Sequence, residues 1–321
     1  MIHSVDVIIP TYRPGPDVRT LLLRLLHQSY PVSHIQIVNT DETKWDPSIT
    51  EGISIVQVRH IGKSAFDHGS ARNLGAADSQ ADYIVFMTQD AIPGDRYMIG
   101  KLVEAMQRDP DVKAAYARQL PKKGCREIER FQRSFNYPPE SRVKRIENLD
   151  ELGIKTFFCS NVCACYDREY FSRSGGFAVP SIFNEDMVFA GNAVRAGYAI
   201  AYAAEARVLH SHNYTNREQF HRNFDNGVSQ AMHPEIFEGI RSEGEGMKMV
   251  TKTAGYLLRK GKAYLIPGLV MQSACKLLGF RLGKNVKKLP REMIMRCTMS
   301  PEFWRNHEEL LSDGERKDCR K

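Results

Sequence analysis

The sequence predicts an α/β fold in which a mainly parallel sheet is covered by helices on both faces. Short apolar runs alternate with segments of helical spacing along the first 120 residues, and this alternation is typical of βαβ units. The 321 residues are 42% apolar and 26% charged. That composition is ordinary for a globular protein, and it excludes a collagen-like, coiled-coil or disordered chain.

Five strands are expected, each an apolar run that ends at polar or turn-forming residues. They are placed at residues 5–9, 35–38, 53–58, 83–87 and 112–117. Three helices are expected between them. The first begins near Asp17, whose side chain can cap it, and carries leucines and a valine at helical spacing. The second covers residues 69–78, and the third includes Leu102, Val103 and Met106 before Asp109-Pro110.

Polar residues follow four successive strands. In an open α/β sheet, ligands bind at the carboxyl ends of the strands, so these segments predict one shared ligand site. The first strand is followed by neither a GxGxxG nor a GxxxxGK[ST] motif, which argues against a dinucleotide oxidoreductase and a P-loop ATPase. A phosphorylated ligand would therefore be held by a metal ion or by basic side chains. The four segments are Pro10-Thr11-Tyr12-Arg13, Asn39-Thr40-Asp41, residues 66–75 and Thr88-Gln89-Asp90-Ala91.

The charge is concentrated near the C-terminus. The chain carries a formal net charge of +7, and residues 247–296 alone carry +11. Such a segment binds polyanions, either nucleic acid or an anionic membrane. Only three aromatic residues are interleaved with the basic ones, too few for stacking on bases, so no nucleic-acid partner is expected. The change in composition near residues 243–246 predicts two domains, 1–246 and a basic helical region at 247–321.

The same region carries apolar groups flanked by lysine and arginine. Its apolar stretch at 263–275 is too short for a membrane-spanning helix, which needs about 20 residues. The pattern instead predicts helices that lie in a membrane interface, with lysine side chains reaching the headgroups. The alternative is a solvated helical appendage that packs on the body.

Several motifs, in order along residues 4–230, resemble a family 2 glycosyltransferase. They are Pro10-Thr11-Tyr12, Gly69-x-x-Arg72-Asn73-x-Gly75, Phe86-Met87-Thr88-Gln89-Asp90-Ala91, Asn184-Glu185-Asp186 and His210-Ser211-His212. Two of the sequence forms, TQDA at residues 88–91 and HSHNYT at residues 210–215, look most like the rhamnosyltransferase-like branch of bacterial surface polysaccharide synthesis. The resemblance implies a GT-A fold, with a mixed sheet, a nucleotide-sugar half at about 1–120 and an acceptor half at about 121–246.

A metal site is expected around Asp90, at the end of the fourth strand. A divalent cation can stabilise the charge on a leaving diphosphate, and Mg²⁺ or Mn²⁺ prefers carboxylate oxygen, with imidazole acceptable to Mn²⁺. The family has two or three acidic residues at this position, whereas this chain has one beside Gln89. His210 and His212 follow an expected strand and share one side of it by the period of two, so they are predicted to complete the site. Alternatively, they are loop histidines on the surface.

The resemblance also implies the remaining site residues. Asp186 is expected to be the general base that accepts the proton of the acceptor hydroxyl, with Glu185 as its acidic partner. The alternative is that Asn184 caps a helix whose N-terminal dipole favours both acids. Thr11, Tyr12, Arg13 and Gln89 are expected to line the donor pocket. The other donor contacts are expected from Asp41 near the base and ribose, Asp67 at the base imide, Arg72 at the diphosphate and Asp90.

The resulting expectation is an inverting transfer of rhamnose, from dTDP-rhamnose or another dTDP- or UDP-sugar, to a growing polysaccharide. The acceptor is expected to be lipid-linked, which would place the enzyme at the inner face of the cell membrane as a peripheral protein. A sugar-phosphate nucleotidyltransferase is the first alternative, but residues 11–16 lack the glycine-rich basic loop it needs. A non-catalytic scaffold is the second, and it leaves Asp90, Asp186 and His212 without a role.

Overall fold

A computed structural model describes residues 3–240 and 243–312, which fold into two compact units. Unit 1 contains the chain up to Pro180 together with Glu185–His212, and unit 2 contains Ser181–Asn184 and the chain from Asn213 onward. The boundary expected near residue 246 lies inside unit 2. Residues 313–321 of the expected basic region lie outside the described residues.

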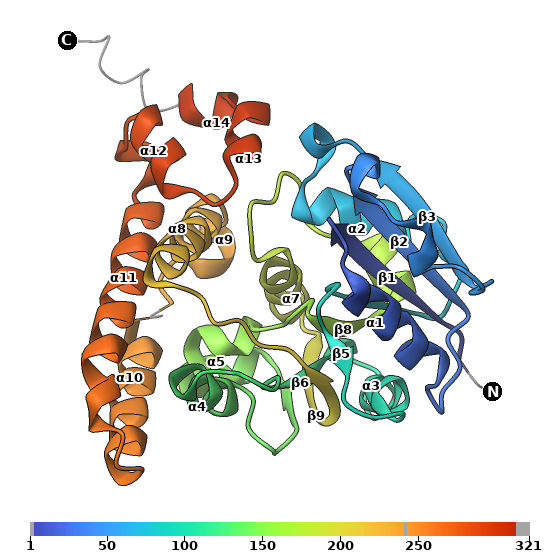
Figure 1. Ribbon diagram of the computed structural model, residues 1–321, viewed down its shortest axis with the longest axis horizontal. Helices are drawn as coiled ribbons and strands as arrows, with labels where there is room; N and C mark the ends of the chain where they lie inside the picture. The colour runs from blue at the N-terminus through green and yellow to red at the C-terminus, as the bar shows by residue number, and fades with distance from the viewer. Residues whose placement is uncertain (1–2, 241–242, 313–321) are drawn as a thin grey trace. The chain divides into compact units, whose positions relative to one another are not determined.

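Unit 1 is built on a nine-stranded sheet (Figure 1). The strands are β1 (Val5–Tyr12), β2 (His34–Thr40), β3 (Val56–Ile61), β4 (Tyr83–Met87), β5 (Ile92–Pro93), β6 (Val112–Leu120), β7 (Arg142–Lys144), β8 (Cys163–Asp167) and β9 (Ala199–Leu209). The helices of this unit are α1 (Pro16–Leu26), α2 (His68–Ala76), α3 (Met98–Gln107), α4 (Glu127–Asn136), α5 (Leu149–Leu152), α6 (Arg168–Arg173) and α7 (Glu185–Arg195).

The sheet is mixed, with the order β3-β2-β1-β4-β8-β6-β9-β5, and β7 pairs with β9. The first four strands in this order are parallel, as expected. β8 is antiparallel to both of its neighbours, β4 and β6. The α/β class and the mixed sheet are therefore confirmed, whereas strand–helix alternation alone predicted only parallel pairs. The direction of β8 could not be predicted from the alternation, because the chain reaches this strand through the irregular stretch between residues 121 and 162.

Helices cover both faces of the sheet. Val5, Val7 and Ile9 of β1 join one buried core with the apolar face of α1 and with α3. Ile8 points to the opposite face, where α2 approaches so closely that a Cβ on Gly75 would lie 2.4 Å from Ile8 Cγ2. Strands that are buried on both faces have mostly apolar sequences. The positions of β1 and β4 could therefore be predicted from their apolar residues.

The third strand begins at Val56 and not at residue 53 as expected. Gly52 adopts a φ of +75°, and the chain around it forms a turn before the strand starts. Ile53 and Ile55 are apolar because they contact the core from this turn. Apolar character therefore predicted burial correctly but placed the start of the strand too early.

Unit 2 is helical, and its two long neighbouring helices lie backbone to backbone. A Cβ on Gly279 or Gly283 of α11 would meet the carbonyl oxygen of Phe220 or Phe224 of α8 at 2.2 or 2.0 Å. Only glycine permits this approach without movement of the backbone. The helices are α8 (Asn216–Met232), α9 (Pro234–Phe237), α10 (Glu243–Arg259), α11 (Ile266–Lys284), α12 (Arg291–Cys297), α13 (Pro301–Asn306) and α14 (Glu309–Ser312).

By length and composition alone, the segment Ala263–Lys284 could cross a membrane. The expectation that the apolar stretch is too short was based on residues 263–275, but the helix continues to Lys284 and so is longer than that stretch. A short 3-10 turn at Ala263–Leu265 precedes α11 and joins it to α10.

Candidate active site

The carboxyl ends of β1, β2 and β4 meet at one edge of the sheet. Thr11 lies opposite Asn39 and Tyr12 lies opposite Thr40 in the parallel pairing of β1 with β2. β4 runs parallel to β1 on its other side, and Thr88-Gln89-Asp90 continue directly from its end. The sheet therefore brings three of the polar segments singled out in the sequence to a common edge.

Three non-glycine residues among or next to the predicted site residues have a strained backbone. Arg13, Asp41 and Asn184 adopt φ values of 47°, 71° and 60°, which non-glycine residues rarely do. Arg13 and Asp41 come at the ends of β1 and β2, and Asn184 directly precedes Glu185. Residues held in such conformations concentrate at functional sites, because the surrounding structure must compensate for a cost of about 1–3 kcal/mol each.

Hydrogen bonds shape the edge near β1. Thr11 Oγ1 donates to Asn39 Oδ1 at 2.9 Å. The Gln89 side-chain amide accepts from the Tyr12 N–H at 2.9 Å and donates to the Tyr12 carbonyl at 3.1 Å. The Gln89 side chain therefore pairs with both backbone polar groups of Tyr12, as the backbone of an adjacent strand would. The Tyr12 side chain is left 39% exposed, with the Arg13 guanidinium 5.1 Å from its ring centre.

The other expected donor-site residues are engaged within the protein. Asp41 Oδ1 accepts from Thr43 Oγ1 at 2.6 Å. Asp67 caps α2, since its Oδ1 accepts from the Ser70 N–H at 2.8 Å. Arg72 is buried, and its guanidinium lies 3.2 Å from Glu185 Oε1. Arg72 thus contacts an acid of the expected acceptor side, a partner that sequence spacing does not reveal. The donor-binding roles of these three residues remain predictions.

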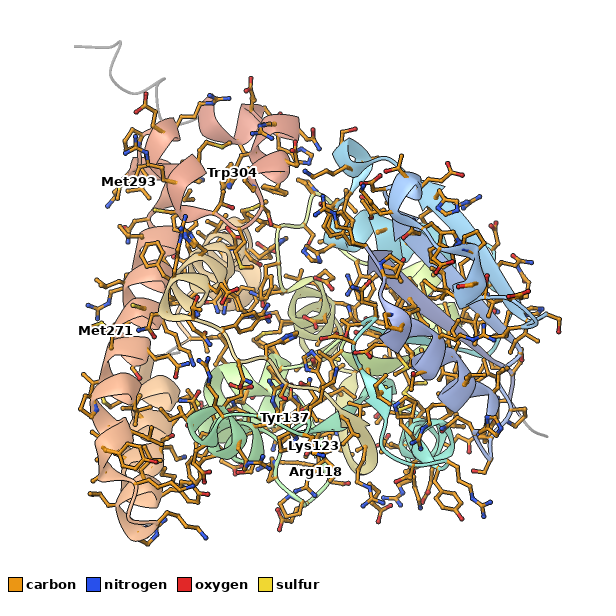
Figure 2. All side chains as sticks on the ribbon, in the orientation of Figure 1. Arg118, Lys123, Tyr137, Met271, Met293 and Trp304 are labelled. Carbon is orange, nitrogen blue, oxygen red and sulfur yellow. The ribbon has the colours of Figure 1, made fainter. Side chains whose placement is uncertain are left out.

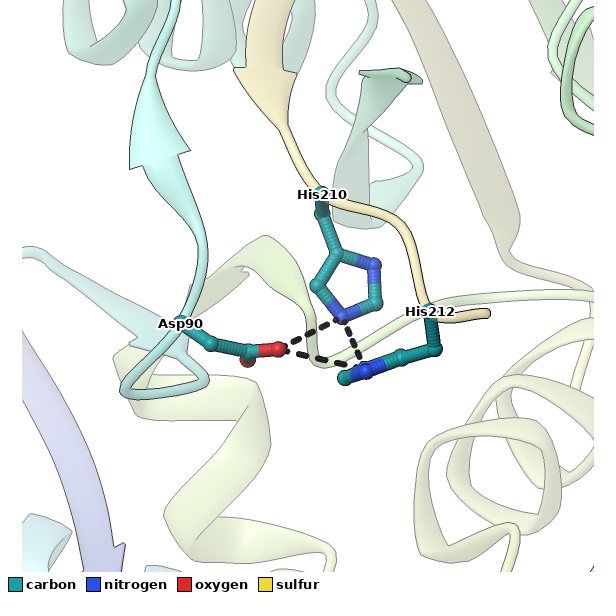
Figure 3. Close-up of side chains that lie close together, drawn as sticks. All are labelled: Asp90, His210 and His212. Atoms are coloured by element: carbon teal, nitrogen blue, oxygen red, sulfur yellow. Dashed lines mark hydrogen bonds and ion pairs between the residues drawn. The ribbon is translucent and has the colours of Figure 1, made fainter. Parts of the chain in front are cut away.

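Asp90, His210 and His212 converge on one point (Figure 3). Asp90 Oδ2 lies 3.3 Å from His210 Nε2 and 3.1 Å from His212 Nε2, and the two Nε2 atoms are 3.0 Å apart. His210 directly follows β9 and is buried, while Asp90 and His212 are half-buried. The structure therefore brings together the three residues expected to bind metal.

The chemistry of this cluster fits a divalent cation. Two adjacent ligands about 2.1 Å from an octahedral cation lie about 3.0 Å apart, close to the separations of the three atoms here. Carboxylate and imidazole together suit Mn²⁺. Burial would raise the pKa of Asp90, but His210 and His212 lower it well below its usual range. Burial lowers the pKa of His210, so this ring is favoured as a neutral ligand.

Glu185 and Asp186 begin α7, and Asn161 holds both. The Asn161 side chain donates to Glu185 Oε1 at 3.0 Å, and its backbone N–H donates to Asp186 Oδ2 at 2.8 Å. Tyr166 fixes the Asn161 side chain by donating to its Oδ1 at 2.8 Å. The sequence did not reveal Asn161 as a contact of both acids, since an asparagine in a turn is ordinary.

The surroundings of Glu185 and Asp186 shift the pKa values of the two carboxyl groups in opposite directions. Burial and the charge of Glu185 raise the pKa of Asp186 well above its usual range. Burial would raise the pKa of Glu185 as well, but Arg72, His68 and the hydrogen bond from Asn161 together lower it. Glu185 is thus a fully buried, ion-paired carboxylate, while Asp186 is partly exposed. Two carboxyl groups separated in this way can serve as a structural anion and a general base.

The chain is similar in sequence to known proteins. Residues 6–175 match the model of the family "Glycosyl transferase family 2". The chain is 36% identical over 305 residues to the O-antigen chain rhamnosyltransferase RfbN of Salmonella typhimurium, covering 94% of this chain and 96% of the relative. It is also 36% identical over 309 residues to the O-antigen chain rhamnosyltransferase WbaN of Salmonella anatum, with the same coverage.

Two solved structures share the fold. The mannosyltransferase PcManGT of Pyrobaculum calidifontis, in complex with GDP-Man and Mn²⁺, aligns with a TM-score of 0.56 at 16% identity, covering 100% of this chain and 88% of that chain. Residues 1–349 of TarS from S. aureus, in complex with UDP-GlcNAc, align with a TM-score of 0.51 at 11% identity, covering 88% and 90%.

Proposed function

The chain belongs to glycosyltransferase family 2 and is a glycosyltransferase, and we propose that it transfers rhamnose from dTDP-rhamnose to a hydroxyl group of a bacterial O-antigen chain. The observation that carries the proposal is the identity of 36% to two O-antigen rhamnosyltransferases over 94% of the chain. Family membership decides against a sugar-phosphate nucleotidyltransferase and against a non-catalytic scaffold.

The proposed reaction is a single displacement. The acceptor oxygen attacks the anomeric carbon, the bond from that carbon to the diphosphate breaks, and the acceptor proton passes to the Asp186 carboxylate. Glu185 cannot act as a second nucleophile, because it is buried against Arg72 and Asn161. With Asp90 assigned to the cation, Asp186 is the one carboxylate available to the acceptor, and the anomeric configuration is expected to invert.

Asp90, His210 and His212 would hold a divalent cation, Mn²⁺ or Mg²⁺. When bound, such a cation stabilises the negative charge that develops on the leaving diphosphate. The side of the site at Thr11, Tyr12, Arg13 and Gln89 would receive the nucleotide.

A donor panel tests the proposed function. The protein is incubated with dTDP-rhamnose, UDP-glucose or GDP-mannose in Mn²⁺, and release of nucleoside diphosphate is measured with and without an O-antigen acceptor. We expect dTDP release from dTDP-rhamnose to exceed release from the other donors, and the acceptor to increase it. Faster turnover of GDP-mannose, or a product that retains the anomeric configuration, would contradict the proposal.

We further propose that unit 2 binds the anionic inner face of the cell membrane, because an O-antigen acceptor would be lipid-linked. Large apolar side chains are exposed at 56–74% along the α10–α11 hairpin: Leu258, Tyr264, Val270, Met271 and Leu278. Met271 is labelled on α11 in Figure 2. Exposed basic residues accompany them: Arg259, Lys260, Lys284, Lys287 and Lys288. Each basic side chain near an anionic surface contributes about 1 kcal/mol, and exposed apolar groups add insertion energy.

The packing of α11 favours a helix that lies in the interface over one that crosses the bilayer. Gly279 and Gly283 hold α11 against α8, whose sequence is rich in charged and amide side chains. A crossing of the bilayer by α11 would draw these polar groups into hydrocarbon or break the packing, and either is costly.

Sedimentation with anionic liposomes tests the membrane proposal. Full-length protein is expected to pellet at low salt and to be released as salt screens the basic residues. Met271→Gln with Leu278→Gln should reduce pelleting, while Met293→Gln, a change to an exposed methionine on α12, should not. Full-length protein that stays in the supernatant at low salt, or equal loss in both variants, would overturn the proposal.

A further inference from the structure

Behind the Asp90–His210–His212 cluster lies a buried glutamine, Gln119, near the end of β6. Its side-chain oxygen, Oε1, lies 3.0 Å from His210 Nδ1, the ring nitrogen on the far side from Asp90. Its side-chain nitrogen donates to Tyr137 Oη at 2.6 Å and to Ser160 Oγ at 2.9 Å. Every polar atom of this amide therefore has a partner.

Arg133 of α4 determines which way the amide points. Its guanidinium donates to Gln119 Oε1 and is itself paired with Glu129 one helical turn away. Arginine has no acceptor atom, so the Gln119 atom that faces it must be the oxygen. A flipped amide would place an NH₂ group against the guanidinium.

The orientation of Gln119 in turn defines the tautomer of His210. Gln119 Oε1 lies 3.0 Å from Nδ1, closer than Asp90 Oδ2 lies to Nε2 at 3.3 Å, so a hydrogen on Nδ1 makes the shorter hydrogen bond. A cation between Asp90 and Nε2 would remove the need for a hydrogen on Nε2. The Arg133 guanidinium, a donor, lies 3.4 Å from the same Nδ1, farther away than the accepting Gln119 oxygen, and it already donates to Gln119 and Glu129. In a neutral ring with hydrogen on Nδ1, Nε2 bears the free lone pair. Nε2 is the atom that faces Asp90 and His212.

We propose that Gln119, oriented by Arg133, is a positioning residue that holds His210 in its Nδ1–H tautomer and aims Nε2 at a divalent cation shared with Asp90 and His212. The inference rests on the metal site of the proposed function. Outer-shell partners of this kind orient the ligating ring and increase its basicity. The two positioning residues come from β6 and α4, elements separate from those that carry the three ligands.

Binding of Mn²⁺ is measured first, from the loss of the free-ion EPR signal. Gln119→Leu keeps the approximate volume but removes the acceptor, and it should weaken Mn²⁺ binding by about 10–100-fold. Gln119→Glu keeps an acceptor for both His210 and Arg133 and should retain most of the affinity. Gln28→Leu is the matched control, because the Gln28 side chain also makes three hydrogen bonds and none of them is to the cluster. It donates to the carbonyl oxygens of Arg24 and Asp95 and accepts from the Ile99 N–H.

The tautomer is measured separately, from long-range ¹H–¹⁵N NMR spectra of protein labelled on histidine, at about pH 8, where an ordinary histidine is neutral. His210 is assigned by loss of its signals in His210→Gln. Wild type and Gln119→Glu should show the Nδ1–H pattern, while Gln119→Leu should show a mixture with the Nε2–H form. Mg²⁺ can be added without paramagnetic broadening.

Failure of this inference is distinguishable from failure of the metal site. If wild type and Asp90→Asn bind Mn²⁺ equally weakly, the metal site is wrong, and the NMR spectra still decide whether Gln119 holds the tautomer. If wild type binds but Gln119→Leu binds as tightly, or if His210 carries its hydrogen on Nε2 in wild type, the inference is overturned. An equal loss of affinity in Gln28→Leu would also overturn it, because the effect would then be a general loss of packing.

Discussion

Replacing Asp186 by asparagine is expected to lower turnover by about 10²–10⁴-fold, the usual contribution of a general base. The change keeps the size of the side chain and leaves an oxygen that can accept from the Asn161 N–H, so unit 1 should remain folded. Donor binding should be unchanged, since Asp186 acts on the acceptor hydroxyl. Initial rates with dTDP-rhamnose and acceptor, together with equilibrium binding of dTDP, measure both effects.

The dependence of activity on pH provides a second test of Asp186. A base must be deprotonated to act, and burial and Glu185 raise the pKa of Asp186 above its usual range. The value of kcat/KM should therefore rise with pH through this raised pKa, at a higher pH than an ordinary aspartate would give. The residual activity of Asp186→Asn should lack that rise.

Asp167→Asn is the matched control for this position, because Asp167 is also a carboxylate at the start of a helix, where it caps α6 by accepting from the Tyr170 N–H. It should retain turnover close to that of wild type. Turnover by Asp186→Asn within tenfold of wild type, or an unchanged acidic limb in its pH profile, would assign the base elsewhere.

Replacing Asp90 by alanine is expected to abolish transfer while the fold is kept. The carboxylate is the one anionic group within the three-residue cluster, and its loss would leave two imidazoles to hold a divalent cation. His210→Ala and His212→Ala should each reduce activity and the affinity for Mn²⁺. EDTA should inhibit the wild type, and added Mn²⁺ or Mg²⁺ should restore it. Circular dichroism and thermal unfolding verify the fold.

Asp95→Asn is the control for Asp90→Ala, because it also removes a negative charge from this segment but not from the proposed metal site. Asp95 lies five positions after Asp90 and pairs with Arg207, 2.8 Å away, on the surface. Its replacement should leave Mn²⁺ affinity unchanged. Activity that survives both histidine changes and also survives EDTA would show that transfer needs no metal at this cluster.

The positions of the polar strand ends could be predicted from the sequence, because they depend on local patterns. The segment Val5–Ile9 is apolar except for Asp6 and is buried on both faces of the sheet, so the residues after it lead to the sheet edge. The local pattern is therefore enough to predict that Thr11, Asn39 and Gln89 lie at this edge, although it does not predict their contacts. The start of β3 was missed because apolar residues of a turn and of a strand look alike over a few positions.

The α/β class, the order of the site motifs, the positive charge of residues 247–296 and the residue types that can hold a cation or take a proton all follow from the sequence. Which of these groups meet depends on the folded chain. The contacts of Asp90 with His210, Glu185 with Arg72 and Gln119 with His210 join residues about 90–120 positions apart. Such contacts follow from the order and direction of strands, above all from the antiparallel β8 between β4 and β6. Strand order is set by the packing of the whole sheet and its helices, which no local pattern of residues contains.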